Sequence, residues 1–516
     1  MRTERPLWFV HRESSRDPVN GHIQKGTHAK PNQENPHTQG RAVPNCKHDY
    51  NLRALSQKSN QFPVALTLVQ SKPSRAPMSS QKELALDTAR ILRGAGHLVY
   101  FAGGAVRDQL RGIEPEDYDL ATSATPTEVL ALFPKSDAVG EHFGVIIVKG
   151  HREMIEVTTF RTDGSYKDGR RPESVEFSSP EEDAQRRDFT INGLFQDPFS
   201  GKIIDHVGGK TDLETGILRA IGDPKKRFQE DALRLLRAIR FSVVIGFEIE
   251  RETLEALKEC APLLKQISPE RIRDEFSKIL VSKDRGRGLD LLAETGLAKT
   301  FLPELLTLKG CEQPPEWHPE GDVYVHTRIA LSLLDSPPLN LALAVLLHDI
   351  AKPPTQTWDD KVKRFRFNGH DRVGAKMAGE ILRRLRYPNQ TIEEVSFMVS
   401  RHMKFMHVQE MRTAKLKRFM AAISFPMEIE LHRVDCESSN GFRGNYDFLH
   451  LKQEEFANEP LIPAPLLTGK DLIDKFSLSP SPKIGEILRA VQTEQLEGRL
   501  SDKERALAFV KESLSA

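Results

Sequence analysis

The hydrophobic period of this 516-residue chain changes near residue 225, and that change limits the folds open to it. Before it, short apolar runs such as "HLVYFA", "GVIIV" and "MIEVTTF" alternate with helix-like segments, as in an α/β domain. After it, apolar residues recur every three to four positions almost to the end, as in "LEALKECAPLL" and "NLALAVLLHDIA". The sequence therefore predicts an α+β protein, with one α/β domain followed by helical domains.

Length divides the chain further, because 516 residues exceed what one hydrophobic core usually holds. We place an α/β domain at 78–225, a helical unit at 226–310, a second at 311–440 and a helical tail at 441–516, with the Pro-rich "CEQPPEWHPEGD" as a linker. Residues 1–77 are rich in polar and basic side chains and Pro, so we expect a disordered extension. Alternatively, translation starts at Met78.

Charge and cysteine usage exclude several classes of protein. The net charge of +1 does not indicate nucleic-acid binding, although local arginine clusters near residues 186 and 234 could meet a polyanion. No C-x-x-C pair occurs, which argues against a disulfide framework or a thiolate zinc site. No apolar run is long enough to cross a bilayer, and no secretory signal is visible at the N-terminus. The sequence therefore predicts a cytoplasmic protein without a membrane partner.

Two carboxylates, Asp117 and Asp119, are separated by a single residue in "FAGGAVRDQLRGIEPEDYDLATSATP". On a strand, side chains alternate between faces, so both carboxylates would meet one site while Tyr118 faces away. Clustered carboxylates repel each other unless a cation lies between them, and hard oxygen ligands suit Mg²⁺. We therefore expect a magnesium site here.

A Gly-Gly turn precedes this pair at Gly103 and Gly104. Glycine lets backbone amides approach a triphosphate closely, and Arg107 at the start of the following helix could hold its charge. Magnesium ions can activate an attacking hydroxyl and stabilise a leaving pyrophosphate. Together, these features indicate nucleotidyl transfer.

Longer motifs carry a family resemblance over roughly residues 84–280. "GGAVRDQLRGIEPEDYDLATSATP" is followed by "FGVIIV", "IEVTTFR", "RRDFTINGLFQDP", "EDALRLLRAIRF" and "SPERIRDEF". This series resembles the bacterial class II CCA-adding tRNA nucleotidyltransferases and poly(A) polymerases. The resemblance implies a polymerase-beta-like nucleotidyltransferase head, a helical neck and an RNA substrate.

The resemblance also implies roles for individual residues of the head. Asp117 and Asp119 would be catalytic and bind Mg²⁺, and Glu156 on a neighbouring strand is a weaker candidate for a further carboxylate. The residues implied to contact the nucleotide are Gly104, Arg107, Arg187 and Asp188.

In "EDALRLLRAIRF", Asp231, Arg234, Arg237 and Arg240 recur every third residue, so on one helix they would form a polar stripe. A carboxylate and a guanidinium together offer acceptors and donors that can pair with the edge of a base. By resemblance, Asp231 and Arg234 select CTP or ATP without a nucleic-acid template, with Glu230 alongside. We expect the whole stripe to bind nucleotide.

The helical half contains "VHTRIALSLL", "AVLLHDIAKP", "FNGHDRVGA", "VSRHMKF" and "LHRVDCES". This order resembles the HD domain of metal-dependent phosphohydrolases. The implied metal ligands are His326, His348, Asp349, His370, His402 and Asp435. Imidazole and carboxylate together suit a transition metal such as Ni²⁺ or Mn²⁺. The resemblance implies phosphatase and 2′,3′-cyclic phosphodiesterase activity; the alternative is a helical body that grips tRNA without catalysis.

The RNA whose 3′ end is extended distinguishes a CCA-adding enzyme from a poly(A) polymerase. "AVGEHFGVIIVKGHREMIEVTTFR" resembles the CCA-adding form, and the sequence has no long basic C-terminal tail of the kind that gripping any RNA would need. We therefore expect CCA addition to tRNA from CTP and ATP. The loop "TDGSYKDGRRP" at 162–172 resembles the element associated with switching to ATP. The alternatives are a poly(A) polymerase, a CC- or A-adding partial enzyme, an HD phosphohydrolase with an RNA-positioning head, and a non-catalytic tRNA-binding protein. The oligomeric state is left open.

Overall fold

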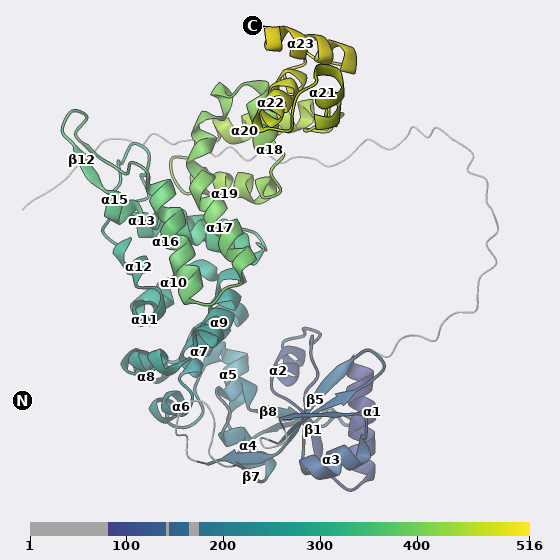
Figure 1. The fold of residues 1–516 in the computed structure, drawn as a ribbon. Helices are drawn as coiled ribbons and strands as arrows, with labels where there is room; N and C mark the ends of the chain where they lie inside the picture. Colours follow the sequence, from purple (N-terminus) through teal and green to yellow (C-terminus); the bar gives the residue numbers. More distant parts are fainter. Residues whose placement is uncertain (1–80, 141–143, 165–174, 516) are drawn as a thin grey trace, which may run out of the picture. The chain divides into compact units, whose positions relative to one another are not determined.

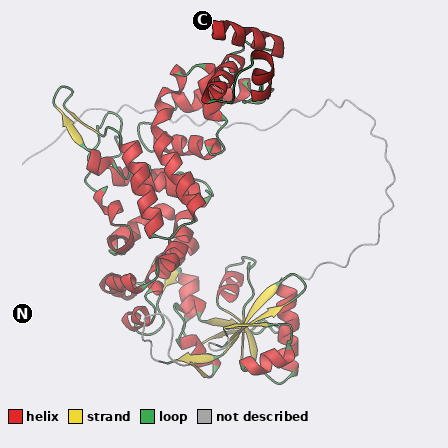
Figure 2. Cartoon of the chain, viewed as in Figure 1, coloured by secondary structure: helices red, strands yellow, loops and turns green. Residues whose placement is uncertain are grey.

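The computed structural model of the chain describes residues 81–140, 144–164 and 175–515 (Figure 1). The expected extension at 1–77, the alternative start at Met78 and most of the loop at 162–172 lie outside the described residues. Figure 2 shows an α/β region followed by a largely helical one. The predicted fold class is therefore confirmed.

A seven-stranded sheet of order β3-β4-β5-β2-β1-β8-β9 forms the centre of the head. Its strands are β1 (Val99–Ala102), β2 (Leu120–Thr122), β3 (Asp137–Gly140), β4 (Val145–Lys149), β5 (Met154–Thr159), β8 (Leu194–Gln196) and β9 (Ile203–Asp205). Within this sheet, β2 and β5 pair in parallel, and the other described pairs are antiparallel. Helices α1 (Gln81–Gly94) and α3 (Pro126–Leu132) pack on one face, where apolar side chains of alternate strand positions are buried. The other face carries a smaller buried cluster of Ala102, Ala121, Phe160, Ala184 and Phe195.

The Asp-x-Asp pair does not lie on a strand as predicted. β2 begins at Leu120, and Asp117 and Asp119 lie in the chain just before it. The carbonyl of Asp119 still accepts the amide of Ala102 at 3.1 Å, so the extended chain continues the pairing with β1. Tyr118 is buried and meets Phe101 edge-on at 5.3 Å. The predicted separation of Tyr118 from the two carboxylates therefore holds without a formal strand.

The rest of the head consists of short elements that carry site residues. These are α2 (Gly104–Leu110), the small sheet of β6 (Arg161–Asp163) and β7 (Val175–Phe177), α4 (Pro180–Gln185), η2 (Thr190–Asn192) and α5 (Gly209–Thr215). Helix α4 begins with a complete capping box, in which Ser179 and Glu182 bond each other's backbone amides.

The helix predicted through "EDALRLLRAIRF" is broken at Asp231. α6 (Pro224–Glu230) ends there and α7 (Leu233–Ile245) follows, because Asp231 has extended dihedral angles of φ −140° and ψ 103°. Its Oδ1 accepts the amide of Leu233 at 3.0 Å, which replaces a backbone acceptor at the start of α7. The four-residue stripe is therefore not on one helix: Arg234, Arg237 and Arg240 are on α7, and Asp231 precedes it.

One continuous buried core begins with Phe189 and Ile191, includes α7 and runs through the following helices to α19 (Phe425–Glu437). The helices between them include α8 (Arg251–Cys260), α9 (Pro269–Val281), α10 (Arg285–Glu294), α11 (Ala298–Phe301), α12 (Pro303–Thr307), α13 (Val323–Ser332), α14 (Leu339–Leu347), α16 (His370–Arg384) and α17 (Asn389–Arg401). Cys311 and Gln313 of the expected linker are buried, so this segment packs against the helices. The domain boundary near residue 310 stays a prediction.

A β-hairpin interrupts the helices between α15 (Lys352–Thr355) and α16. It consists of β12 (Thr357–Asp359) and β13 (Arg364–Arg366), with Trp358 edge-on to Phe365. Another two-stranded sheet, β10 (Ile217–Leu218) with β11 (Glu248–Ile249), is parallel.

The last part of the chain contains η4 (His402–Glu410), α18 (Thr413–Met420), α20 (Gly444–Glu455), α21 (Gly469–Phe476), α22 (Pro482–Leu496) and α23 (Lys503–Ser515). These helices form small cores of their own around Phe405 and around Leu472. Within the part of the chain that the structure describes, no helix combines the length and apolar character needed to cross a membrane.

Candidate functional site

A cavity of about 200 Å³ opens in the head, lined by Asp119, Glu156 and Arg187 among others. Glu156 lies on β5 between Ile155 and Val157, which are both buried in the core on the opposite face. Strand alternation therefore turns Glu156 toward the cavity. The structure thus brings together Asp119 and the weaker carboxylate candidate.

The carboxylate of Asp119 is in an environment that disfavours its charge. Desolvation by surrounding protein atoms, then the charges of Glu156 and Asp117, raise its pKa to about 6, although Arg187 opposes the shift. Asp117 is exposed and accepts a weak hydrogen bond from Gln81 at 3.4 Å. A bound cation would relieve the repulsion among these carboxylates, so the donor set suits a divalent metal with oxygen ligands.

The Gly-Gly turn borders this cavity. Gly103 has a φ of 64°, which favours glycine, and a Cβ there would come within 3.3 Å of Nη1 of Arg187. Arg107 on α2 is already held by the protein: it contacts both oxygens of Asp108 and donates from Nη1 to Asn192 at 2.8 Å. A contact between Arg107 and the nucleotide stays a prediction. It requires Arg107 to give up, or share with the nucleotide, its hydrogen bonds to Asp108 and Asn192.

Arg187 and Asp188 are adjacent in sequence and have different partners. Arg187 pairs with buried Asp183 at 2.9 Å. Asp188 is buried. It accepts hydrogen bonds from Arg237 on α7 at 2.8 and 2.6 Å, and from the side-chain Nδ2 of Asn192 at 3.0 Å. The structure therefore joins Asp188 of the head to the arginine stripe of the neck.

The base-selection candidates each have partners as well. Asp231 pairs with Arg271 on α9 at 2.9 Å, and Arg234 pairs with Glu230 at 2.6 Å. The backbone amide of Arg234 also bonds the carbonyl of Asp231 at 3.0 Å, so the two residues are neighbours in space. Their side chains are thus oriented by ion pairs rather than by each other.

Arg240 has a different ion-pair partner from these two residues. Its Nε lies 2.6 Å from Oε2 of Glu275 on α9, and both side chains are largely buried. Arg237 also lies 3.9 Å from Glu275. Residues Arg271 and Glu275 were missed as site residues, although "SPERIRDEF" places them four apart on one helical face.

The six predicted HD residues come together in the helical region. Oδ2 of Asp349 lies 3.2 Å from Nε2 of His348 and 3.7 Å from Nε2 of His326. Its Oδ1 lies 3.4 Å from Nε2 of His370 and 3.9 Å from Nε2 of His402. One aspartate therefore faces two pairs of histidines, one pair with each oxygen. Oδ1 of Asp435 joins the first pair, 3.1 Å from His326.

The remaining ring nitrogens fix the orientation of these histidines. Nδ1 of His348, His370 and His402 each lie 2.7 or 2.8 Å from a backbone carbonyl, which requires a proton on Nδ1. The Nε2 atoms then present lone pairs to one another, at 3.0 Å between His370 and His402. Converging lone pairs and carboxylates are the donor chemistry of a metal centre, so the residues present fit one.

The charges in this cluster agree with that interpretation. Burial disfavours a charged His348, but Asp349 and Asp435 outweigh it and raise its pKa to about 10. Burial and the charge of His348 lower the pKa of His402 to about 4. Without a metal, one imidazole must hold a proton to balance the carboxylates, and a metal ion would take its place.

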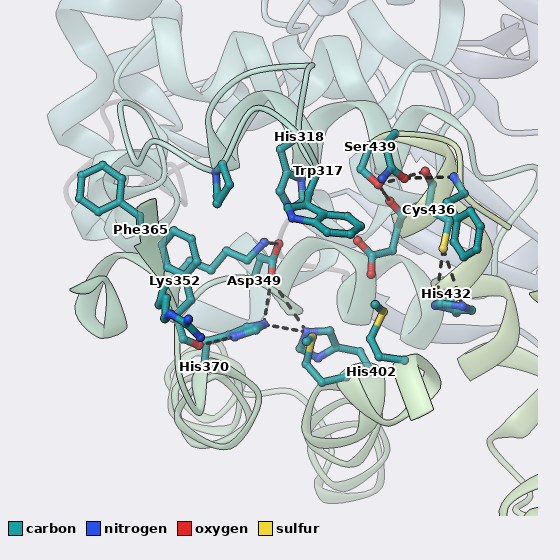
Figure 3. Close-up of a pocket in the computed structure, with 18 of the residues that line it drawn as sticks. Trp317, His318, Asp349, Lys352, Phe365, His370, His402, His432, Cys436 and Ser439 are labelled. Atoms are coloured by element: carbon teal, nitrogen blue, oxygen red, sulfur yellow. Dashed lines mark hydrogen bonds and ion pairs between the residues drawn. The ribbon is translucent and has the colours of Figure 1, made fainter. Parts of the chain in front are cut away.

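Two further residues contact this cluster and were missed by sequence reasoning. Oε1 of Glu320 lies 2.8 Å from Nδ1 of His326 and 2.9 Å from Nδ1 of His318. Nζ of Lys352 lies 2.6 Å from Asp349 and 2.6 Å from the side chain of Gln313. Figure 3 shows Lys352 beside Asp349. Glu320 lies in the Pro-rich segment that the sequence predicts to be a linker, so its sequence context gives no sign of this contact. Lys352 follows Asp349 by three residues, a spacing that one helical turn brings together.

Comparison with protein families matches four segments, of which the last two overlap. A poly A polymerase head domain matches residues 99–219, a probable RNA- and SrmB-binding site of polymerase A matches 246–308, an HD domain matches 318–423, and a tRNA nucleotidyltransferase domain 2 matches 371–510. The HD match ends before Asp435.

Whole-chain relatives are CCA-adding enzymes. That of Geobacillus thermodenitrificans is 34% identical over 432 residues, which are 83% of this chain and 96% of the relative. That of Streptococcus gordonii is 34% identical over 439 residues, 84% of this chain and 98% of the relative. A second Geobacillus relative, from Geobacillus stearothermophilus, is 48% identical over 222 residues, 43% of this chain and 54% of the relative.

Solved structures agree. The crystal structure of the Bacillus stearothermophilus CCA-adding enzyme in complex with CTP has a TM-score of 0.64 and 28% identity, and the match covers 85% of this chain and 99% of that one. The Thermotoga maritima CCA-adding enzyme complexed with tRNA shares the fold, with a TM-score of 0.56, 21% identity and coverage of 84% and 95%. With a head, an RNA-binding segment and an HD domain in this order, the chain belongs to the family of CCA-adding enzymes.

Proposed function

We propose that this protein adds C, C and A to the 3′ end of tRNA, using CTP and ATP. The observation that carries this proposal is the cavity where Asp119, Glu156 and Arg187 meet beside the Gly-Gly turn, in a chain of the CCA-adding family. The 3′-hydroxyl of the tRNA attacks the α-phosphate of the nucleotide. A new P–O bond forms, and the bond to pyrophosphate breaks.

The head residues hold the reactants for this step. Asp117 and Asp119 would hold Mg²⁺, which when bound activates the attacking hydroxyl and stabilises the leaving pyrophosphate. Glu156 completes the anionic wall of the cavity. Arg187, held by Asp183, presents positive charge beside it and so favours a phosphate there. Gly104 and Arg107 are assigned to the triphosphate, and Asp188 to the ordering of Arg237.

The neck selects the base. Asp231 offers acceptors and Arg234 offers donors, and together they can pair with the edge of either cytosine or adenine. Arg271 and Glu230 orient these side chains, so selection requires the base to compete with two existing ion pairs. We assign 78–225 to the head, 226–310 to the neck, 311–440 to the HD domain and 441–516 to a tail that contacts tRNA.

A poly(A) polymerase and a CC- or A-adding enzyme are the nearest alternatives. The relatives that this chain matches over almost their full length are named as CCA-adding enzymes, which favours the complete reaction. The residues at 162–172 that would mark the switch to ATP fall mostly outside the described part of the chain.

A second activity is supported by the HD centre. We propose a metal-dependent phosphohydrolase that acts on phosphorylated or 2′,3′-cyclic RNA ends. His326, His348, Asp349 and Asp435 would hold one transition metal such as Ni²⁺ or Mn²⁺, and His370 and His402 with Asp349 a second. Such ions polarise a phosphoryl oxygen and lower the pKa of bound water. The observation that favours this activity is the convergence of four Nε2 atoms on Asp349.

Pyrophosphate release from CTP and ATP with a tRNA transcript that lacks CCA tests the main proposal. Asp117→Asn and Asp119→Asn should each lower the rate at least about a hundredfold, as expected when a group that supports transition-state charge is lost. Glu116→Gln, the neutralisation of an adjacent exposed carboxylate, is the matched control and should retain activity. Full turnover in both aspartate variants would exclude this site.

Phosphate release from RNA ending in a 3′-phosphate or a 2′,3′-cyclic phosphate, with Mn²⁺ or Ni²⁺ added, tests the second activity. Asp349→Asn should abolish release and leave CCA addition intact. Release that is unchanged in Asp349→Asn would place the hydrolysis elsewhere.

A further inference from the structure

The HD centre lies in a larger cavity of about 380 Å³, and much of its wall is made by residues other than the six metal-ligand candidates. This volume is in the range of pockets that hold a small organic ligand. Figure 3 shows Trp317 and His318 on one side of this space, with His402 and His432 on another. The wall residues therefore define what the metal centre can act on.

Among the described basic residues of this wall, Arg364 of the hairpin is the one whose side chain has no protein partner. The other two basic residues of the wall are committed: Lys352 pairs with Asp349 and Gln313, and Arg366 pairs with Asp359. Among the described residues, none forms a hydrogen bond or ion pair with the side chain of the half-buried Arg364. A guanidinium held without a partner beside a metal centre is suited to a phosphate oxygen.

The rim of the cavity is apolar and exposed. Trp317 has 51% of its surface exposed, and among the described residues no aromatic ring stacks on its indole. Met403, Met406 and Phe442 line the same cavity and are exposed by 40%, 51% and 65%. Large apolar side chains around a polar centre indicate a ligand with a flat apolar part.

Both features line the same cavity as the cluster that would hold the metals. We propose that Trp317 and Arg364 form a nucleotide subsite of the HD centre, in which Trp317 stacks on a nucleobase and Arg364 binds the phosphate presented to the metals. The inference rests on the proposed phosphohydrolase function and names its substrate unit. The unit is a ribonucleotide with a terminal phosphate, either free or at the end of an RNA chain.

Stacking does not distinguish one base from another, since every base offers an aromatic face. No side chain is assigned to read the base edge. The subsite therefore accepts all four nucleotides, which suits an enzyme that meets RNA ends of different sequence.

The experiment uses the full chain loaded with Mn²⁺ and compares three substrates. Adenosine 3′-monophosphate carries a base, a short RNA with a 3′-phosphate carries a base and a chain, and glycerol 2-phosphate carries no ring of any kind. Trp317→Ala should raise KM for the first two about tenfold, the loss expected for one stacked base, and change KM for glycerol 2-phosphate much less. Arg364→Gln should raise KM for all three and weaken inhibition by inorganic phosphate.

The hairpin and its neighbour helix offer matched controls. Trp358 is also 51% exposed but does not line the cavity, and Arg372 on α16 is exposed outside it. Trp358→Ala and Arg372→Gln should leave KM unchanged for every substrate. CCA addition should be unchanged in all four variants. Equal effects of Trp317→Ala and Trp358→Ala, or equal effects on substrates with and without a base, would overturn the inference.

A direct binding measurement separates this inference from the hydrolase proposal. If none of the three substrates is hydrolysed, the hydrolase proposal fails, and quenching of tryptophan fluorescence by adenosine monophosphate decides the subsite. Saturable quenching that persists in Trp358→Phe and disappears in Trp317→Phe supports it; the absence of quenching overturns it. A lower KM for the RNA than for the mononucleotide identifies the RNA end as the source of the ligand, and equal values identify the free nucleotide.

Discussion

Asp188 of the head accepts two hydrogen bonds from Arg237 of α7, at 2.8 Å from Nε and 2.6 Å from Nη2. Both hydrogen bonds end on Oδ2 of Asp188, and they join the head to α7, the helix that follows Asp231. Burial of the pair makes its geometry expensive to disturb. It joins the two regions beside the buried contact of Phe189 with Phe241.

The first prediction concerns this pair and pH. Burial opposes ionisation of Asp188, but the charge of Arg237 and the hydrogen bond from Asn192 outweigh it and lower the pKa to about 2, from an ordinary value of 3.8. A lowered folded-state pKa contributes stability that is present above pH 3.8 and is lost as the pH falls through 2. Asp188→Asn should therefore lower the free energy of unfolding by about 2 kcal/mol at pH 7 and by less at pH 3.

Urea unfolding at both pH values measures this difference. Asp87→Asn is the control, because its pair with Arg90 is exposed by 62% and 63% and should contribute little. A loss for Asp188→Asn that is the same at pH 7 and pH 3 would contradict the assigned pKa.

The second prediction concerns Glu275, which lies at 2.6 Å from Nε of Arg240 with both side chains largely buried. Glu275→Ala leaves Arg240 buried without its counter-charge, so stability should fall by about 3 kcal/mol. Thermal unfolding or urea unfolding measures this loss. Glu255→Ala removes the exposed pair with Arg251 and should cost much less. Equal losses would mean that the buried arginine finds another partner.

The third prediction concerns Glu320, which accepts from Nδ1 of His326 at 2.8 Å and so directs Nε2 of that histidine into the HD cluster. Partners of this kind typically change metal affinity about 10- to 100-fold. Glu320→Ala should weaken Mn²⁺ binding by this factor, as measured by titration with the metal. Glu320→Gln keeps an acceptor and should weaken binding less; exposed Glu316→Ala is a further control. If Glu320→Ala binds metal as the unchanged protein does, the orienting role is wrong.

The fourth prediction separates two roles of Asp231, which caps α7 through the amide of Leu233 and is assigned to base selection. Asp231→Asn keeps an oxygen for the cap but loses the charge, whereas Asp231→Ala loses both. We expect the ratio of kcat/KM for CTP and ATP to change in both variants, and the stability to fall mainly in Asp231→Ala. A changed stability with an unchanged ratio would leave Asp231 as a cap only.

Motif order predicted much of this structure, because the residues of each motif lie close in sequence or follow a regular period. The six HD residues are one example, and the order of an α/β region followed by a helical region is another. The break at Asp231 escaped prediction, because the three-residue spacing of Asp231, Arg234, Arg237 and Arg240 continues across it. At this position the side chain of Asp231, and not a backbone carbonyl, accepts the amide of Leu233. The role of Glu320 also escaped it, because only the folded chain brings this residue to His326. Long-range partners such as Glu275 for Arg240 depend on helix packing that spacing does not reveal.

The central claim is tested most directly with three RNA transcripts: a tRNA ending before CCA, a tRNA ending in CC, and an unrelated RNA 3′ end. Each is incubated with CTP, ATP or both, and the products are resolved to single nucleotides. The account predicts addition of C, C and A to the first, of A alone to the second, and no efficient addition to the third. Long A tracts on all three RNAs would contradict it in favour of a poly(A) polymerase, and addition that stops after CC or requires a CC end would indicate a partial enzyme.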